Sequence, residues 1–300
     1  MTARVRVGAR PRAWLGAPVV LLSVAALIAS EAALLAPGRT LAADIVFAVL
    51  VFILLNAAAI ALRSESPEAW VTARALQALA LVALARVVAF GLPLHDASAA
   101  AGTLAVAVLI GLAAAFAAPT LGASLKGLMA FSPSVDQAYA AAAGLVLGIA
   151  AYVVGAPTLW ARGAGGSRIM VALVAVAAAS VTEELLFRGL VQSTLQRSIG
   201  RAGLLAATAL FAATYLGLGP AALVMVVALA GLVFAVIVAR TGNLTGAVAG
   251  HALFALGAGA FWPVLLGRRH HAWLQGPGVI VVVGVALAAM TVIALRTAGD

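Results

Sequence analysis

The chain has no cysteine and few charged residues. Without cysteine it can form neither a disulfide bond nor a thiolate metal site. Only 9% of its 300 residues are charged, whereas 65% are hydrophobic. A soluble domain needs a surface in which about a quarter to a third of the residues are charged. Most of this surface must therefore face lipid, and a water-soluble globular protein is excluded.

The apolar residues gather in runs that are long enough to cross a membrane. A helix rises roughly 1.5 Å per residue, so about 20 residues span a hydrocarbon core of about 30 Å. Because unpaired backbone groups are costly in lipid, such runs are predicted to be helices. The sequence therefore predicts an all-α, polytopic transmembrane helix bundle of about ten spans, at residues 14–36, 42–62, 69–91, 99–118, 137–156, 169–190, 202–218, 221–239, 243–263 and 277–296.

The predicted spans divide the chain into three parts. Residues 1–160 hold N-terminal transmembrane helices of unassigned role, residues 165–263 hold the candidate chemistry, and residues 264–300 hold a loop and a C-terminal transmembrane helix. A glycine-containing linker at 156–168 separates the first two parts. The segment 120–136 is predicted to be a loop or a short interfacial helix.

The net charge of +9 comes from basic residues that mostly lie at the ends of the apolar runs. Basic residues in these positions contact anionic headgroups and set the topology, so membrane lipid is the expected partner and nucleic acid is not. Four arginines precede the first span and indicate a cytoplasmic N-terminus. Ten spans return the C-terminus to the same side. We expect an integral protein of the bacterial cytoplasmic membrane with both termini in the cytoplasm.

Several polar residues fall inside the predicted spans, where an unpartnered charge costs several kcal/mol. Arg74 and Arg86 lie near span ends and are expected to extend to the interface. Glu31 and Asn56 lie deeper and are expected to join helices through polar contacts.

Glu183 and Glu184 are adjacent carboxylates late in an apolar span, and they form the main candidate for a catalytic cluster in the sequence. Glu184 and Arg188 are four residues apart, so they share a helix face and can pair, while Glu183 points elsewhere. Two neighbouring carboxylates in a low-dielectric site cannot both ionise at low cost without cations. A carboxylate in this state suits a general base that activates water. An arginine-bridged helix end at the interface is the alternative interpretation.

His251 lies in the middle of the ninth predicted span. It follows Gly242, Gly246 and Gly250, a spacing that lets another helix approach closely. The histidine is therefore either a buried hydrogen-bonding residue or a group presented to a site across the helix contact.

At these residues the chain resembles the CPBP family, the CAAX protease and bacteriocin-processing (Abi) family of intramembrane metalloproteases. The family's first motif is a Glu-Glu pair followed by three residues and Arg, and it is present as Glu183, Glu184 and Arg188. Its second motif is Phe, three residues, then His; Phe211 matches, but Tyr215 stands in place of His.

The third motif of the family is His, three residues, then Asn. Here His251 matches, but Ala255 stands in place of Asn. The resemblance covers residues 165–263, which it implies are a CPBP-like protease core.

The resemblance implies hydrolysis of a peptide bond by glutamate-activated water in a cavity that opens to the membrane. It assigns water activation to Glu183 and Glu184, orientation to Arg188, and metal binding or oxyanion stabilisation to His251. Tyr215 cannot accept a proton near neutrality, but it can donate a hydrogen bond to an oxyanion. The family accounts differ on metal: either zinc or another divalent ion binds, with Glu184 and His251 as ligands, or none does.

Three functions follow from these observations. The first is an intramembrane endopeptidase acting on a membrane-associated peptide or protein. The second, suggested by Tyr215 and Ala255, is a catalytically impaired protein of the same fold that binds a membrane partner. The third is a transporter, which the absence of internal repeats disfavours.

Overall fold

The computed structural model describes residues 16–33, 40–64, 66–91, 99–131, 134–156, 166–216 and 218–266. Every regular element within these ranges is a helix, which confirms the predicted all-α class. The tenth predicted span, 277–296, and both termini lie outside the described residues.

The helices, in chain order, are α1 (Gly16–Ala33), α2 (Thr40–Leu62), α3 (Pro67–Gly91), α4 (Ala99–Ala117), α5 (Leu125–Leu128), α6 (Val135–Val153), α7 (Gly166–Glu184), α8 (Ser193–Ile199), α9 (Ala202–Ala213), α10 (Ala221–Thr241), α11 (Thr245–Leu256) and α12 (Trp262–Leu266), with π-helical segments η1 (Leu185–Gln192) and η2 (Gly257–Phe261).

Eight helices of the described residues are long and apolar enough to cross a membrane. Their outer faces carry large apolar side chains that are mostly exposed, among them Leu22, Phe52 and Phe116. Such faces are stable in lipid and costly in water. The chain is therefore an integral membrane protein.

The predicted span at 202–218 is wrong in its length. Helix α9 has only 12 residues, from Ala202 to Ala213, which corresponds to about 18 Å. Its buried apolar side chains, among them Leu210 and Phe211, pack in the protein interior, whereas Leu205 is exposed. Because the helix ends early, Tyr215 lies in the turn that follows, and its hydroxyl group reaches Glu183 and His251.

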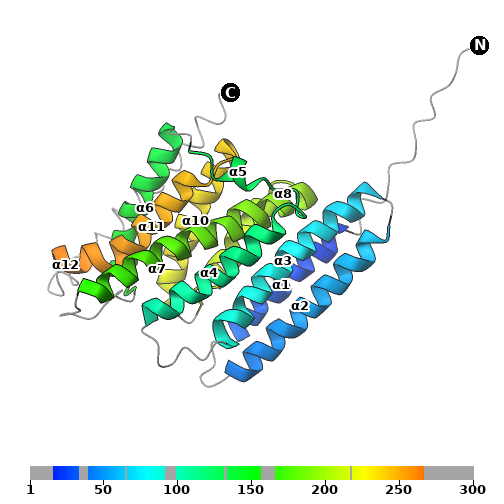
Figure 1. Ribbon diagram of the computed structural model, residues 1–300, viewed down its shortest axis with the longest axis horizontal. Helices are drawn as coiled ribbons and strands as arrows, with labels where there is room; N and C mark the ends of the chain where they lie inside the picture. Colours follow the sequence, from blue (N-terminus) through cyan, green and yellow to red (C-terminus); the bar gives the residue numbers. More distant parts are fainter. Residues whose placement is uncertain are drawn as a thin grey trace, which may run out of the picture.

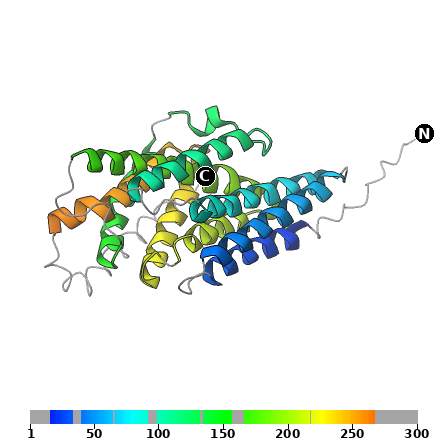
Figure 2. The same cartoon turned by 60° about the horizontal axis from the view of Figure 1, so that its bottom comes forward.

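The helices form two groups (Figure 1). Helices α1, α2 and α3 form one group, and the remaining helices, in which α4 lies along α7, form the other. Helices α1, α2 and α3 pack side by side at the N-terminal end of the bundle. Helix α4 packs along α7, and α6 packs along α11, as both views show (Figure 2). The short helix α5 lies in the segment 120–136, which was predicted to be a loop or a short interfacial helix.

Glycines bring α6 and α11 into backbone contact. A Cβ atom added to Gly250 would lie 2.4 Å from the carbonyl oxygen of Ala140, and one added to Gly246 would lie 2.6 Å from Cα of Gln137. Neither position tolerates a side chain without separation of the helices. The predicted close approach is thus confirmed at Gly246 and Gly250, where it sets the position of His251 on α11. It is wrong at Gly242, which ends α10 and has no atom within 4 Å of an added Cβ.

One ion pair joins the N-terminal helices to each other. Glu31 on α1 lies 2.8 Å from Arg86 on α3, and its side chain is buried. The prediction that Glu31 joins helices is confirmed. Arg86, expected to extend to the interface, turns to this carboxylate instead, because pairing offsets the cost of two charges in the bundle. The prediction for Asn56 is wrong: its side chain is exposed and donates to the carbonyl of Phe52 in its own helix.

Candidate active site

The two adjacent glutamates lie where helix geometry changes. Glu183 and Glu184 are the last two residues of α7, and the π-helical segment η1 begins at Leu185. The chain then continues as helix to Ile199, so the glutamates sit inside one long apolar span. π-Helical turns are rare and frequently mark functional sites, because the extra residue per turn redirects side chains.

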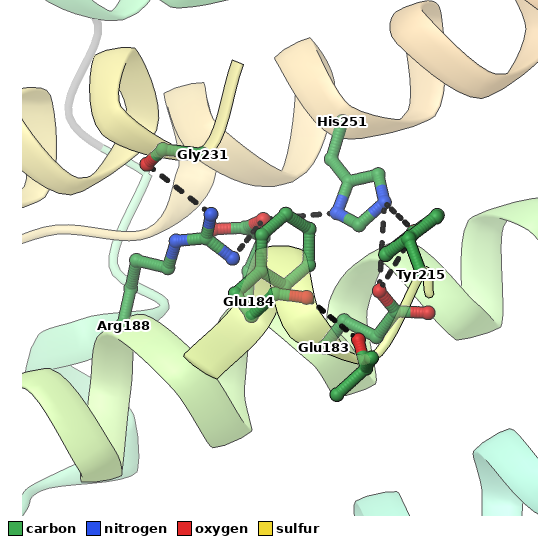
Figure 3. A network of polar contacts seen from close by, with 8 residues as sticks. Glu183, Glu184, Arg188, Tyr215, Gly231 and His251 are labelled. Carbon is green, nitrogen blue, oxygen red and sulfur yellow. Dashed lines mark hydrogen bonds and ion pairs between the residues drawn. The ribbon is translucent and has the colours of Figure 1, made fainter. Parts of the chain in front are cut away.

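Glu184 is fully enclosed by its partners (Figure 3). Its side chain has 0% exposure, and its Oε1 lies 3.1 Å from Nη1 of Arg188 and 2.9 Å from Nδ1 of His251. The predicted pairing with Arg188 is confirmed. A buried carboxylate is stable only with such partners. Glu184 therefore has no access to a substrate, and it orients the imidazole of His251.

Arg188 is held in turn by groups on two other helices. Its Nη2 donates to the carbonyl oxygen of Gly231 on α10 at 3.2 Å. Its guanidinium carbon lies 4.0 Å from the ring centre of Phe211 on α9, a favourable cation–π contact. A Cβ atom at Gly231 would lie 2.9 Å from this guanidinium, so the glycine makes the space that Arg188 occupies.

Glu183 differs from its neighbour in being accessible. Its side chain is 33% exposed and lines a cavity. Its Oε2 accepts a hydrogen bond from the Tyr215 hydroxyl at 3.2 Å and lies 3.7 Å from Nε2 of His251 (Figure 3). The sequence predicted that Glu183 points away from Glu184. In the structure the two carboxylates reach opposite nitrogens of one imidazole ring.

The imidazole of His251 is fixed on every side. Besides the two glutamates, Nε2 lies 3.5 Å from the Tyr215 hydroxyl. The ring meets Phe211 edge-on at 5.7 Å and stacks on Phe234 at 6.3 Å between centroids. With Nδ1 committed to a carboxylate, Nε2 is the nitrogen available to a reacting group. This is the arrangement of an oriented histidine beside an accessible carboxylate.

A cavity of about 390 Å³ opens beside Glu183. Its walls are mainly apolar and come from α3, α4, α7 and η1, with Val82, Val106, Ile110, Leu186 and Phe187 among them. Polar groups are few: besides Glu183, the lining includes Arg86 and three threonines. Thr182, one of these, also ties α7 to α4 by donating to the carbonyl of Ala107 at 2.8 Å. An apolar pocket with a few convergent polar groups is typical of a ligand site.

The donor set fits poorly with the metal that the resemblance implied. Catalytic zinc usually has three protein ligands. Glu184 and Glu183 lie at opposite edges of the His251 ring, so one ion on either nitrogen could meet only one of them. Among the described residues no group of three or more His, Cys, Asp or Glu side chains could hold a metal ion. The metal at Glu184 and His251 stays a prediction.

Comparison with known proteins finds one family whose sequences are similar to the segment that carries this site. The sequence model of the family described as Rce1-like, type II CAAX prenyl endopeptidase, matches residues 165–257. We refer to residues 165–257, which are similar to this family, as the Rce1-like domain. The match confirms the predicted CPBP/CAAX resemblance, and it falls on the segment that carries all five predicted site residues. No curated protein and no solved structure matches the chain.

The structure brings together all five predicted residues, Glu183, Glu184, Arg188, Tyr215 and His251, within the Rce1-like domain. Their proximity is confirmed, whereas their catalytic roles stay predictions. Ala255, four residues after His251, supplies no polar side chain to this network, whereas Tyr215 donates a hydrogen bond to Glu183.

Sequence reasoning missed other groups that build the site. Phe234 and the carbonyl of Gly231 lie on α10, within the predicted span 221–239, which has no polar side chain to single it out. A glycine in the middle of an apolar span was the only available signal for Gly231. The cavity wall from α3 and α4 lies outside the Rce1-like domain, and only tertiary structure shows that it faces Glu183.

Proposed function

We propose that the chain is an intramembrane endopeptidase that hydrolyses peptide bonds of membrane-associated substrates with water activated by Glu183. The observation that carries the proposal is the division between the glutamates. Glu184 is enclosed by Arg188 and His251, whereas Glu183 faces a cavity next to two hydrogen-bonding groups. A structural ion pair needs only the first arrangement. The second adds an accessible carboxylate where a water molecule and a carbonyl group can meet.

The proposed reaction uses Glu183 as general base. Its carboxylate takes a proton from a water molecule in the cavity while the water oxygen bonds to the substrate carbonyl carbon. Tyr215, and His251 when protonated at Nε2, donate hydrogen bonds to the oxyanion that forms. Glu183 then gives its proton to the amide nitrogen, and the C–N bond breaks to release an amine and a carboxylic acid. Glu184 and Arg188 hold His251 in place without touching the substrate.

The proposed substrate is a peptide or protein segment that reaches the site from the membrane. The cavity next to Glu183 has the size of a ligand pocket and mainly apolar walls. An apolar side chain or alkyl group next to the scissile bond would fill it and exclude water from the reacting atoms. Helices α3 and α4, rather than the Rce1-like domain alone, would then select that group.

A second function is favoured by one observation. Tyr215 and Ala255 stand where the family motifs have His and Asn, which removes a proton acceptor and an amide from the site. Loss of one preorganised donor costs about 100- to 1,000-fold in rate. A chain of this fold that binds a membrane partner without cleaving it is the alternative, and it predicts that binding survives Glu183→Gln.

Peptidase activity separates the two functions. Detergent-purified wild type is incubated with a library of quenched fluorescent peptides, beside Glu183→Gln and Glu68→Gln. The control makes the same chemical change at a glutamate of α3 that lies outside the site. We expect cleavage by wild type and Glu68→Gln and none by Glu183→Gln. Cleavage at equal rates by all three proteins would reject Glu183 as the base, and no cleavage by any would favour the binding function.

The proposed location is the bacterial cytoplasmic membrane with the end that carries Lys126 and Arg197 in the cytoplasm. The bias of basic residues supports this orientation. Because the natural chain has no cysteine, a single Lys126→Cys variant gives an unambiguous test in intact cells. We expect a membrane-impermeant thiol reagent to label it only after the cells are opened; labelling of intact cells would reverse the orientation.

A further inference from the structure

Two arginines from distant parts of the chain converge on one turn at the end of the bundle. Arg74 lies on α3 and Arg197 on α8, and both reach the turn at Leu121 and Gly122 that follows α4. A Cβ atom added to Gly122 would lie 3.1 Å from Nη1 of Arg74 and 3.2 Å from Nη1 of Arg197. The two guanidinium groups are therefore close neighbours across a single glycine.

The described residues offer these two positive charges hydrogen-bond acceptors but no carboxylate partner. Arg197 donates to the carbonyl oxygens of Leu121 at 3.2 Å and Gly122 at 3.4 Å. Neither arginine forms an ion pair with a carboxylate of the described residues. Like charges this close repel each other, and the repulsion grows where water is scarce. An anion between them would convert the repulsion into attraction.

Gly122 keeps the space between the arginines open. Its φ angle of 74° is in the left-handed region, which glycine adopts without strain. A side chain here would also meet both guanidinium groups. The turn thus presents two forked donors around an uncovered stretch of backbone. Arginine forks match the oxygen atoms of phosphate in pairs, and lysine does not.

The surroundings indicate where such a phosphate would come from. Arg74 also lines a shallow groove with Pro67, Trp70 and Val71, and the Trp70 ring is 48% exposed. Exposed tryptophans in membrane proteins gather at the level of the headgroups. A lipid whose phosphate lies at the arginines can place its glycerol and upper acyl chain in this groove. A free phosphate ion makes no use of it.

We propose that Arg74 and Arg197 bind the phosphate of an anionic phospholipid headgroup over Gly122, with the lipid body in the groove at Trp70. Two guanidinium groups favour a headgroup of net negative charge over a zwitterionic one. This site is separate from the cavity at Glu183 and does not depend on the proposed peptidase activity.

Native mass spectrometry of the detergent-purified chain tests the site by titration with phosphatidylglycerol, phosphatidylcholine or inorganic phosphate. Arg74→Gln is the principal variant, because Arg74 forms no hydrogen bond within the described residues whose loss would unfold the chain. Arg197→Lys keeps the charge and removes the fork. Arg201→Gln is the matched control, since it removes a charge from an exposed arginine four residues further along.

We expect the wild type to bind phosphatidylglycerol more tightly than phosphatidylcholine. Arg74→Gln and Arg197→Lys should each weaken phosphatidylglycerol binding by about tenfold or more, the effect of losing charge-assisted hydrogen bonds. Arg201→Gln should change it less than twofold. Equal weakening by Arg201→Gln would show unspecific charge attraction and overturn the proposal. Tight binding of inorganic phosphate without a preference for phosphatidylglycerol would instead identify a free-phosphate site.

Discussion

The molecule buries a carboxylate–guanidinium pair in each of its two regions, and the two pairs differ in their surroundings. In the N-terminal helices, Glu31 meets Arg86 at 2.8 Å between α1 and α3. In the Rce1-like domain, Glu184 meets Arg188 at 3.1 Å, but the same carboxylate also holds His251, and a second glutamate faces the other nitrogen of that ring.

This difference separates a pair that joins helices from a candidate active site, although Arg86 also lines the cavity beside Glu183. One carboxylate and one guanidinium neutralise each other and join two helices. In the Rce1-like domain the charged groups exceed what neutralisation needs, and the additional carboxylate, Glu183, lies in the wall of a cavity. Burial of an ion pair alone therefore indicates nothing about function. An accessible titratable group beside an oriented histidine, in contrast, indicates a candidate functional site.

The largest expected effect comes from removing the accessible charge. Glu183→Gln should lower kcat by about 10⁴-fold, at the upper end for general-base catalysis. It should leave the free energy of unfolding nearly unchanged, because this side chain is partly exposed and Gln can still accept from Tyr215. Peptide cleavage and unfolding in sodium dodecyl sulfate measure the two quantities. A large loss of stability would place Glu183 in the structural class with Glu31.

The N-terminal pair should respond in the opposite way. Glu31→Leu leaves Arg86 without this carboxylate and should cost about 3–5 kcal/mol of unfolding free energy. The double variant Glu31→Leu, Arg86→Met should recover most of that loss, since an apolar pair of similar volume is often as stable. Unfolding titrations of both variants provide the measurement. A double variant as unstable as Glu31→Leu would mean that Arg86 does more than neutralise Glu31.

Tyr215 tests whether the hydroxyl group beside Glu183 takes part in the reaction. Tyr215→Phe keeps the ring contact with Phe211 and removes the donor, so we expect a fall in kcat of about 100-fold or more with little change in KM. Tyr139→Phe, a change of the same chemistry on α6, is the control. Unaltered kinetics in Tyr215→Phe would leave His251 as the oxyanion donor.

The smallest expected effects concern the glycine contact that positions His251. Gly250→Ala forces a methyl group against the backbone of Ala140 and should cost about 1–3 kcal/mol. It should also lower activity, because α11 carries the histidine. Gly166→Ala places its methyl group where no atom lies within 4 Å, and it should be neutral. If the two variants unfolded alike, the close packing of α6 and α11 would not be holding the site.

Hydropathy predicted most of the spans because lipid-facing helices must be apolar over their whole length. The same criterion misjudged α9, since a helix buried in the bundle is as apolar as one in lipid. Its 12 residues and the early turn at Tyr215 depend on packing against α10 and α8, which the sequence does not display.

The residues of the site were predictable because charges inside an apolar span are rare, and because the motif spacing resembles a known family. The different positions of the two glutamates, one buried and one facing the cavity, were not predictable. Which glutamate faces the cavity depends on the π-helical segment after Glu184, on the ring position of His251, and on walls from α3 and α4. Likewise the partner of Glu31 is 55 residues away, and only the packing of α1 on α3 identifies it.

Cleavage in water enriched in heavy oxygen tests whether the peptide bond is hydrolysed by water that Glu183 activates. Wild type and Glu183→Gln are incubated in that water with a peptide that the wild type cleaves, and the products are weighed by mass spectrometry. We expect heavy oxygen in the new carboxyl group of the wild-type product and no product from Glu183→Gln. Labelled product from both proteins at equal rates would contradict this expectation.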